Sequence, residues 1–165
     1  MTKSRVSRRT VLKIAAAASP LFISSRVLGR EGPGANERVN VGIIGLGGRC
    51  RAIAQDCLGI PEMRVVAVCD CFQPRIDALQ KSVGQGQNWK SYTDFRQMIE
   101  NENLDGVMVE TTTHARAWVA CHAMAAGMDA YIEKPMALTI AEGREMVRIA
   151  RKYNRVTQVG TQQRS

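Results

Sequence analysis

The sequence predicts an α/β fold built on a doubly wound parallel sheet. Three observations lead to it: apolar strand-like runs alternate with amphipathic helical stripes from residue 38 onward, glycines cluster at residues 45–48 directly after the first run, and Asp70 ends the second run. Strands that alternate with helices pair in parallel, because each parallel connection needs a crossover. We therefore expect one dinucleotide-binding domain of the Rossmann type at residues 38–165.

The first strand and helix surround the glycine cluster. Residues 39–44 are rich in β-branched side chains and predict a buried strand, and residues 50–58 predict a helix that Gly59 and Pro61 close. The apolar stripe of this helix contains Cys50, Ile53, Ala54 and Cys57. Free cysteine packs as a small hydrophobe, so we expect core thiols here and at Cys69. The five cysteines lack the spacing of a zinc or redox motif, and no metal site is expected.

The second strand and helix repeat this pattern. Residues 63–69 are almost continuously apolar, as in a parallel strand that is covered on both faces, and residues 74–83 follow as a helix. The inner side of that helix is expected to hold Ile76, Leu79 and Val83. Trp89 and Tyr92 lie in a connecting segment, where packing in the core is favoured over stacking on a cofactor. Thr93 is expected to cap a short helix with three inward residues, Phe95, Met98 and Ile99.

Three further strands are predicted at residues 105–109, 128–132 and 156–159. The helix between the first two ends at Gly127, and its apolar stripe contains Ala117, Trp118, Cys121, Met124 and Ala125. Before the last strand, Thr139 and Glu142 match a capping box. The helix that they begin is expected to turn Gly143, Met146, Val147 and Ala150 inward and Arg144, Arg148, Arg151 and Lys152 to solvent.

The glycine cluster predicts a phosphate-binding turn. Gly45 permits the tight turn from strand to helix, and Gly47 lets the backbone approach a pyrophosphate at the helix N-terminus. The third position of the Gly-x-Gly-x-x-Gly pattern is Cys50. The candidate cofactor-binding residues of this turn are Gly45, Gly47, Gly48, Arg49 and Cys50.

Asp70 follows the turn at close to the spacing at which a dinucleotide fold places an acid on the adenosine ribose. Such a carboxylate accepts hydrogen bonds from the ribose hydroxyls and repels a 2′-phosphate, which favours NAD over NADP. The alternative is an aspartate that only caps a helix or holds a turn. Arg75, on the next predicted helix, is a further cofactor-binding candidate.

The charge distribution disfavours a nucleic-acid partner. The formal net charge is +8, but residues 1–29 hold six basic side chains and no acidic one. From Arg30 onward, 17 basic side chains stand against 15 acidic ones. A nearly neutral body lacks the basic surface that nucleic-acid binding requires.

Residues 1–29 resemble a twin-arginine export signal. Arg8 and Arg9 precede an apolar segment at residues 11–23, which is shorter than the roughly 20 residues of a membrane-spanning helix. The alternative is a basic amphipathic helix. We expect transport by the twin-arginine export machinery to the periplasm or the outside, cleavage near Gly29, and a flexible lead-in at residues 30–37.

Residues 38–165 resemble the cofactor half of the Gfo/Idh/MocA family, named for glucose-fructose oxidoreductase, inositol dehydrogenase and rhizopine catabolism proteins. The motifs that carry the resemblance are the glycine turn, Asp70, Thr111 with His114, and above all Glu133-Lys134-Pro135 at a strand end. The resemblance implies an NAD(P)-dependent oxidoreductase that transfers hydride between the nicotinamide and a sugar or polyol. It also implies further cofactor-binding residues, which are Thr111, His114, Glu133, Lys134 and Gln162.

Lys134 is the catalytic residue that the resemblance implies. In the family this lysine lies beside the nicotinamide and polarises or helps to deprotonate the substrate alcohol. The family frequently shows the following Lys-Pro bond in the cis form. The alternative is a surface lysine that pairs with Glu133.

Three positions depart from the family pattern. Cys50 replaces the small third residue of the turn, Thr112 stands where the family has proline, and Arg116 stands where a second histidine is common. They leave the contacts to the nicotinamide open and do not affect the fold.

Family members continue into an α+β substrate domain, and this sequence stops where that domain would begin. We therefore expect a truncated protein, a gene fragment or one part of a split protein, whose full-length form would bind a sugar or polyol and form a homo-oligomer. The periplasm holds no free nicotinamide pool, so an exported enzyme would carry its cofactor tightly bound. A non-catalytic dinucleotide-binding module is the alternative, and a methyltransferase is disfavoured because it has no use for Glu-Lys-Pro.

Overall fold

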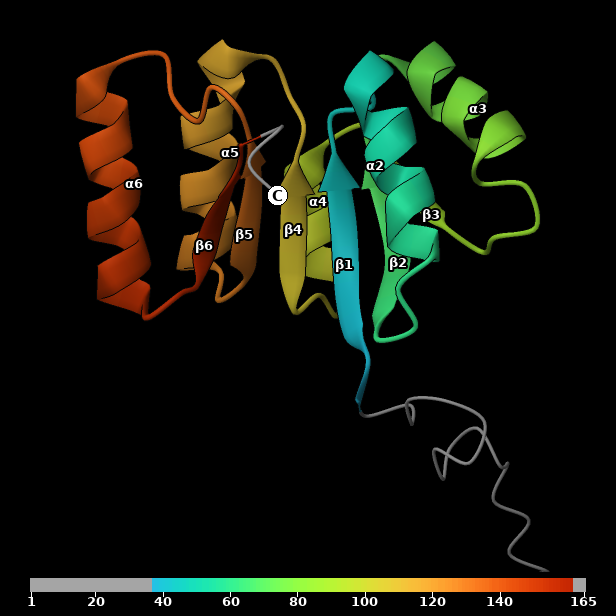
Figure 1. The fold of residues 1–165 in the computed structure, drawn as a ribbon, viewed down its shortest axis with the longest axis horizontal. Coiled ribbons are helices and arrows are strands. Elements are labelled where there is room, and N and C mark those ends of the chain that lie inside the picture. The colour runs from blue at the N-terminus through green and yellow to red at the C-terminus, as the bar shows by residue number, and fades with distance from the viewer. Residues whose placement is uncertain (1–36, 162–165) are drawn as a thin grey trace, which may run out of the picture. The chain divides into compact units, whose positions relative to one another are not determined.

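A computed structural model describes residues 37–161, which form a six-stranded parallel sheet with helices on both faces (Figure 1). The strand order is β3-β2-β1-β4-β5-β6. The strands are β1 (Val39–Ile44), β2 (Met63–Cys69), β3 (Lys90–Tyr92), β4 (Gly106–Val109), β5 (Asp129–Glu133) and β6 (Thr157–Gly160). This order confirms the predicted doubly wound sheet, and it reverses direction between β1 and β4.

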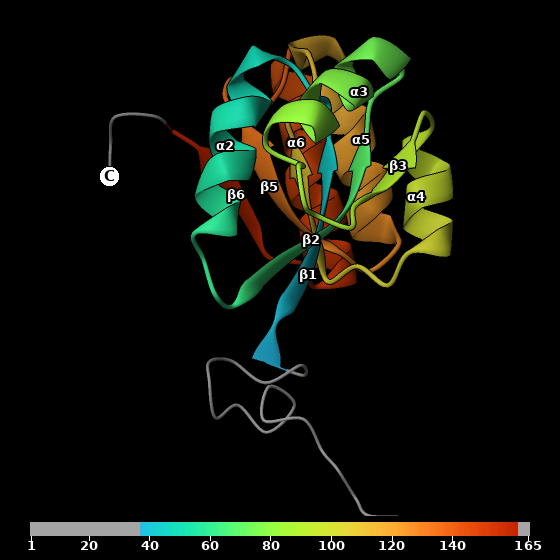
Figure 2. The ribbon, with the colours of Figure 1, turned by 90° about the vertical axis from the view of Figure 1, so that its right-hand side faces the viewer.

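The helices divide the core into two layers (Figure 2). They are α2 (Gly48–Leu58), α3 (Gln73–Ser82), α4 (Phe95–Asn101), α5 (Thr113–Ala125) and α6 (Ile140–Tyr153). One cluster joins α2 and α3 to one face of the sheet, and it buries Cys50, Cys57 and Ile76. The other joins α4, α5 and α6 to the opposite face, where Met98, Met124 and Met146 are buried. Residues of β1 alternate between the two clusters, as strand geometry requires.

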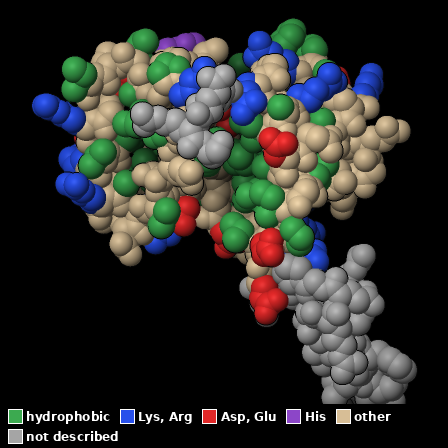
Figure 3. All heavy atoms as spheres, in the orientation of Figure 1, with side chains coloured by type: hydrophobic (Ala, Val, Ile, Leu, Met, Phe, Trp, Pro, Cys, Tyr) green, Lys and Arg blue, Asp and Glu red, His purple; other side chains and the backbone are tan. Residues whose placement is uncertain are grey.

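The predicted core thiols and the predicted capping box are confirmed. Cys50, Cys57 and Cys69 are buried. At the start of α6 the Thr139 hydroxyl accepts a hydrogen bond from the Glu142 N–H at 3.2 Å, and the Glu142 carboxylate accepts one from the Thr139 N–H at 3.0 Å. The four basic residues on the outer side of α6 are exposed, and Figure 3 shows Lys and Arg side chains along that edge of the molecule.

The structure corrects the sequence prediction at five places. One is Ala125, which was predicted in the apolar stripe of α5 but is exposed. Residues 90–92, predicted as a connection, form the edge strand β3, which is too short to show a periodic pattern. The N-cap of α4 is Asp94 rather than Thr93, because the Asp94 carboxylate accepts the Arg96 N–H at 2.9 Å. Trp118 and Val147 were predicted to face inward, but they are 49% and 45% exposed at the margins of their helix stripes. The other element bounds agree with the prediction to within two residues.

Several predictions fall on residues that the structure does not describe. The export signal and the lead-in as far as residue 36 lie outside the described range, as does Gln162. Within residues 37–161, no helix is long and apolar enough to cross a membrane. The same residues contain no group of three or more side chains suited to hold a metal ion.

Candidate functional site

Gly45 is fixed in place by the backbone of the neighbouring strand. Its φ is +92°, and a Cβ at this position would lie 2.5 Å from the Thr111 nitrogen and 2.7 Å from the Glu110 carbonyl carbon. Its own N–H donates to the Cys69 carbonyl at 2.8 Å. A side chain is therefore excluded by both space and backbone conformation, and the chain must turn sharply from β1 into α2.

Gly47 and Gly48 face open space instead. No atom lies within 4 Å of a Cβ built at either position. Gly47 is the N-cap of α2, which has no side-chain cap and no acidic residue in its first turn. No side-chain cap therefore covers the first amides of this helix within residues 37–161, and an uncapped helix N-terminus favours an anion.

Asp70 joins the glycine turn to the loop after β2. Its buried carboxylate accepts the Leu46 N–H at 2.7 Å and the Phe72 N–H at 2.9 Å. The Arg75 guanidinium lies 3.7 Å from the same carboxylate. Asp70 therefore holds a turn, as the alternative interpretation proposed, and it also borders a cleft at the carboxyl ends of the strands.

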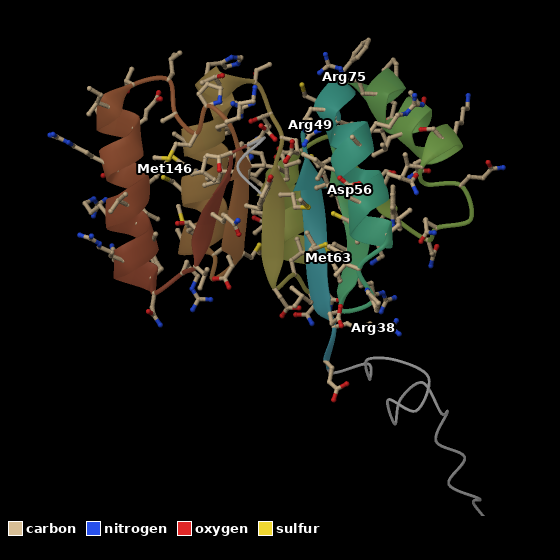
Figure 4. The ribbon with its side chains drawn as sticks, in the orientation of Figure 1. Arg38, Arg49, Asp56, Met63, Arg75 and Met146 are labelled. Atoms are coloured by element: carbon tan, nitrogen blue, oxygen red, sulfur yellow. The ribbon has the colours of Figure 1, made fainter. Side chains whose placement is uncertain are left out.

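A cleft of about 550 Å³ opens at the carboxyl ends of the strands. Eight of the predicted cofactor-binding residues line it: Gly45, Gly47, Gly48, Arg49, Asp70, Arg75, Thr111 and His114. Figure 4 shows Arg49 and Arg75 at this end of the sheet, near the starts of α2 and α3, with Arg38 and Met63 at the opposite end. Ligands of open parallel sheets bind at the carboxyl ends of the strands, and the cleft has that position.

Three predicted residues lie outside the cleft lining. Cys50 packs in the core beneath α2, where burial raises the pKa of its thiol to about 12. Glu133 is buried at the end of β5, and Lys134 is exposed next to it. The Lys134 N–H donates to the Glu133 carboxylate at 2.9 Å, and the Lys134–Pro135 peptide is cis.

Glu110 is the most unusual buried group of the site. It follows β4 directly, only 8% exposed, and neither of its carboxylate oxygens has a hydrogen-bond partner among the described residues. Burial and the nearby Glu133 carboxylate raise the pKa of Glu110 to about 7, although Arg116 and Arg49 oppose the shift. One oxygen of Glu133, which lies 3.8 Å from the Arg49 guanidinium, and the Thr111 hydroxyl are also buried without a hydrogen-bond partner in the described part of the chain. Buried polar atoms without partners mark this floor of the cleft as a place for a polar ligand.

Arg116, which replaces the second histidine of the family pattern, is buried behind this floor. Its guanidinium donates to the Pro135 carbonyl at 2.6 Å and lies 3.4 Å from the Thr113 hydroxyl. Arg116 therefore ties the start of α5 to the Glu133-Lys134-Pro135 loop.

The sequence prediction missed one wall of the cleft, formed by the aromatic rings of Phe95 and Trp118 with the Arg96 guanidinium beside them, which we call the aromatic wall. The Phe95 and Trp118 rings meet edge to face, with centroids 4.9 Å apart. The Arg96 guanidinium lies 5.9 Å from the centroid of the Trp118 ring. Trp118 lies at helical spacing from the buried residues of α5, so the sequence pattern placed it in the core. No local pattern indicated that its ring borders the cleft.

The comparisons with known proteins agree with this geometry. Residues 39–161 match the model of the oxidoreductase family with an NAD-binding Rossmann fold, GFO_IDH_MocA. An inositol 2-dehydrogenase from Salmonella typhimurium is 30% identical over 132 residues, which cover 76% of this chain and 38% of that protein. A glycosyl hydrolase family 109 protein from Shewanella sp. MR-4 is 30% identical over 122 residues, 70% of this chain and 27% of that protein.

Solved structures share the fold. A scyllo-inositol dehydrogenase from Lactobacillus casei, with bound NAD(H) and scyllo-inositol, superposes with a TM-score of 0.68 at 22% identity. The match covers 74% of this chain and 36% of that one. This chain thus spans between about a quarter and two fifths of the length of these proteins.

Proposed function

Because the chain belongs to the Gfo/Idh/MocA oxidoreductase family, we propose that it binds NAD across the carboxyl ends of β2, β1, β4 and β5. We further propose that the whole protein transfers hydride between this cofactor and a hydroxyl or carbonyl of a sugar or polyol. The observation that carries the proposal is the hydrogen bond from the Leu46 N–H to Asp70, which joins the phosphate-binding turn to the ribose-binding acid across one cleft.

The adenosine half of the cofactor fits the β1–β2 side. The pyrophosphate has room over Gly47 and Gly48 at the free N-terminus of α2. Asp70 keeps lone pairs for the ribose hydroxyls, because each carboxylate oxygen accepts more than one hydrogen bond. The Arg75 guanidinium is placed to pack over the base or to meet a 2′-phosphate, so discrimination between NAD and NADP rests on Asp70 and Arg75 together.

The nicotinamide half fits the β4–β5 side. When bound, the nicotinamide supplies the hydride-accepting carbon. Glu133 and Thr111 offer buried oxygens that are free to orient the adjoining ribose. Lys134, at the exposed end of β5, is the proposed proton-handling group for the substrate alcohol.

The first test is cofactor binding by the purified 165-residue chain. Nucleotide released from the denatured protein is identified, and NAD and NADP are titrated into the emptied protein by calorimetry. We expect NAD to bind more tightly than NADP. Absence of binding of either nucleotide would overturn the proposal and its non-catalytic alternative together.

The second test is turnover. Inositols, aldoses and uronic acids are offered with NAD, and both NADH formation and sugar release are measured. The second readout is included because one relative is named a glycosyl hydrolase. Binding without either reaction favours the non-catalytic dinucleotide module for this chain.

We also propose that residues 1–29 direct export through the twin-arginine machinery. Arg8 and Arg9 directly before an apolar segment support it. Residues 1–37 fused to a reporter that is active only after export should give a signal, and the double substitution Arg8→Lys, Arg9→Lys should abolish it. Equal export of both fusions would contradict the proposal.

A further inference from the structure

Glu110 is a buried acid that the proposed function does not yet use. Both its oxygens are buried without a hydrogen bond, and its backbone forms the wall against which Gly45 packs. An ionised carboxylate in such a place loses its hydration and accepts no hydrogen bond in return, which costs free energy. Glu110 nevertheless lines the cleft.

The sheet register explains what lies next to Glu110. β4 and β5 are parallel, with Val109 opposite Ile132, so the next residues in register are Glu110 and Glu133. Neighbouring strands are about 4.8 Å apart, and two acids at this spacing disfavour simultaneous ionisation. The Glu133 carboxylate accepts a hydrogen bond from the Lys134 N–H, and the Arg49 guanidinium lies 3.8 Å from it.

The other titratable neighbours do not neutralise Glu110. Arg49 on α2 and Arg116 on α5 lower its pKa, and Glu133 on β5 raises it. Cys50 and Cys57 on α2 and Tyr131 on β5 have raised pKa values and are neutral below pH 9. Burial and the Glu133 carboxylate therefore favour the neutral form of Glu110 up to about pH 7, the value to which its pKa is raised.

The strand order places this proton under the cofactor. A dinucleotide lies across the point where the order reverses, which is the gap between β1 and β4. Glu110 is the first residue beyond β4 at that point. A neutral carboxyl donates one hydrogen bond, whereas a carboxylate at the same place repels the pyrophosphate.

We propose that Glu110 is a further cofactor-binding residue: its neutral carboxyl group, beside Glu133, donates its O–H to an oxygen of the dinucleotide, in the pyrophosphate or the nicotinamide ribose. The inference rests on the proposed binding of NAD. It implies that cofactor binding weakens as Glu110 ionises and that binding is accompanied by proton uptake.

The experiment titrates NAD into the 165-residue chain and its variants at pH 6 and pH 8.5. Wild type is expected to lose roughly tenfold in affinity between the two values, the size of one hydrogen bond to a charged group. Glu110→Gln stays neutral and keeps a donor, so its affinity should not change with pH and should exceed that of wild type at pH 8.5. Glu110→Leu should also be independent of pH but should bind more weakly than Glu110→Gln.

Two controls separate this proposal from others. His114 also borders the cleft, so the variant His114→Gln must retain the pH dependence if Glu110 is its source. Titration of ADP at pH 8.5 identifies the acceptor, because ADP contains the pyrophosphate but lacks the nicotinamide ribose. If the pyrophosphate accepts the hydrogen bond, Glu110→Gln should bind ADP more tightly than wild type does. If the nicotinamide ribose accepts it, the two proteins should bind ADP equally.

Calorimetry of wild type in two buffers of different ionisation enthalpy measures proton uptake at pH 7.5 without any variant. Uptake of part of one proton supports the proposal. Equal pH dependence of wild type and Glu110→Gln, or no proton uptake by wild type, overturns it even if NAD binds well. Failure of NAD to bind wild type at any pH would instead overturn the proposed function.

Discussion

The two halves of the cleft differ in how completely their polar groups are satisfied. On the β1–β2 side, each oxygen of Asp70 already accepts a backbone N–H. On the β4–β5 side, both oxygens of Glu110 and the Thr111 hydroxyl in the cleft lining are buried without a hydrogen-bond partner among the described residues, as is one oxygen of Glu133 beside the cleft. The first half is held in shape by the protein alone, and the second half has polar atoms that a ligand would satisfy.

This difference separates structural from ligand-dependent residues. A group with all its protein partners in place stabilises the fold and binds a ligand as an additional task. A buried polar group without hydrogen-bond partners destabilises the fold, and only a hydrogen bond from a bound ligand offsets that cost. Substitutions on the β1–β2 side should therefore lower the free energy of unfolding, and selected substitutions on the β4–β5 side should raise it.

The largest effect is expected for Gly45→Ala. A methyl group there meets the Thr111 nitrogen at 2.5 Å in a left-handed backbone, so we expect a loss of about 3 kcal/mol or more in the free energy of unfolding. The matched control is Gly47→Ala, whose methyl group meets no atom within 4 Å. Urea denaturation should show little change for this control, while calorimetry should show weaker NAD binding. Equal destabilisation of both variants would contradict the assignment of Gly47 to the ligand.

Substitution of Glu110 should instead raise the free energy of unfolding. Its pKa is raised from 4.5 to about 7 in the folded state. Between these values the folded state binds more protons than the unfolded one, so this group makes stability fall as pH rises from about 4.5 to about 7, and the loss persists above that. Removing it with Glu110→Gln should stabilise the chain by up to about 3 kcal/mol at pH 8 and by almost nothing at pH 4. Chemical denaturation at both pH values measures the difference, and a variant that is less stable at pH 8 would contradict this account of the β4–β5 side.

Asp70→Ser is expected to act on both stability and cofactor choice. It leaves the Leu46 and Phe72 amides without their acceptor, at a cost of about 2 kcal/mol. It also removes the charge that repels a 2′-phosphate while Arg75 remains, so the ratio of NAD to NADP affinity should fall. Titration of both nucleotides measures the ratio, with Asp77→Ser on the exposed side of α3 as the control. An unchanged ratio would show that another residue sets the preference.

The fold and the position of Gly45 and Asp70 at the cleft were predictable from the sequence because they depend on local patterns. Gly45 and Asp70 are recognisable from residue type and spacing, and the alternation of runs gives the parallel sheet. The exposed position of Trp118 was not predictable, since a helix stripe has margins that periodicity does not resolve.

The pairing of Glu110 with Glu133 depends on the register between β4 and β5, which no local pattern contains. One signal was present: each acid directly follows a buried strand, and neighbouring parallel strands bring their carboxyl ends together. Combined with the strand order, this pattern would have predicted that Glu110 and Glu133 are neighbours. Arg116 shows the same limit, because its bond to the Pro135 carbonyl joins residues that are far apart in the sequence.

The smallest effect concerns the aromatic wall of the cleft. Trp118 is 49% exposed at the cleft and Trp89 is buried in the core, so Trp89→Phe leaves one tryptophan that reports on the site. If the adenine stacks on this wall, AMP and NAD should both quench the remaining fluorescence, and nicotinamide mononucleotide should not. Trp118→Leu should weaken binding of AMP by about tenfold, a typical contribution of one stacked base. Quenching by nicotinamide mononucleotide alone would move the wall to the other half of the cofactor and reverse the assignment of the two sides.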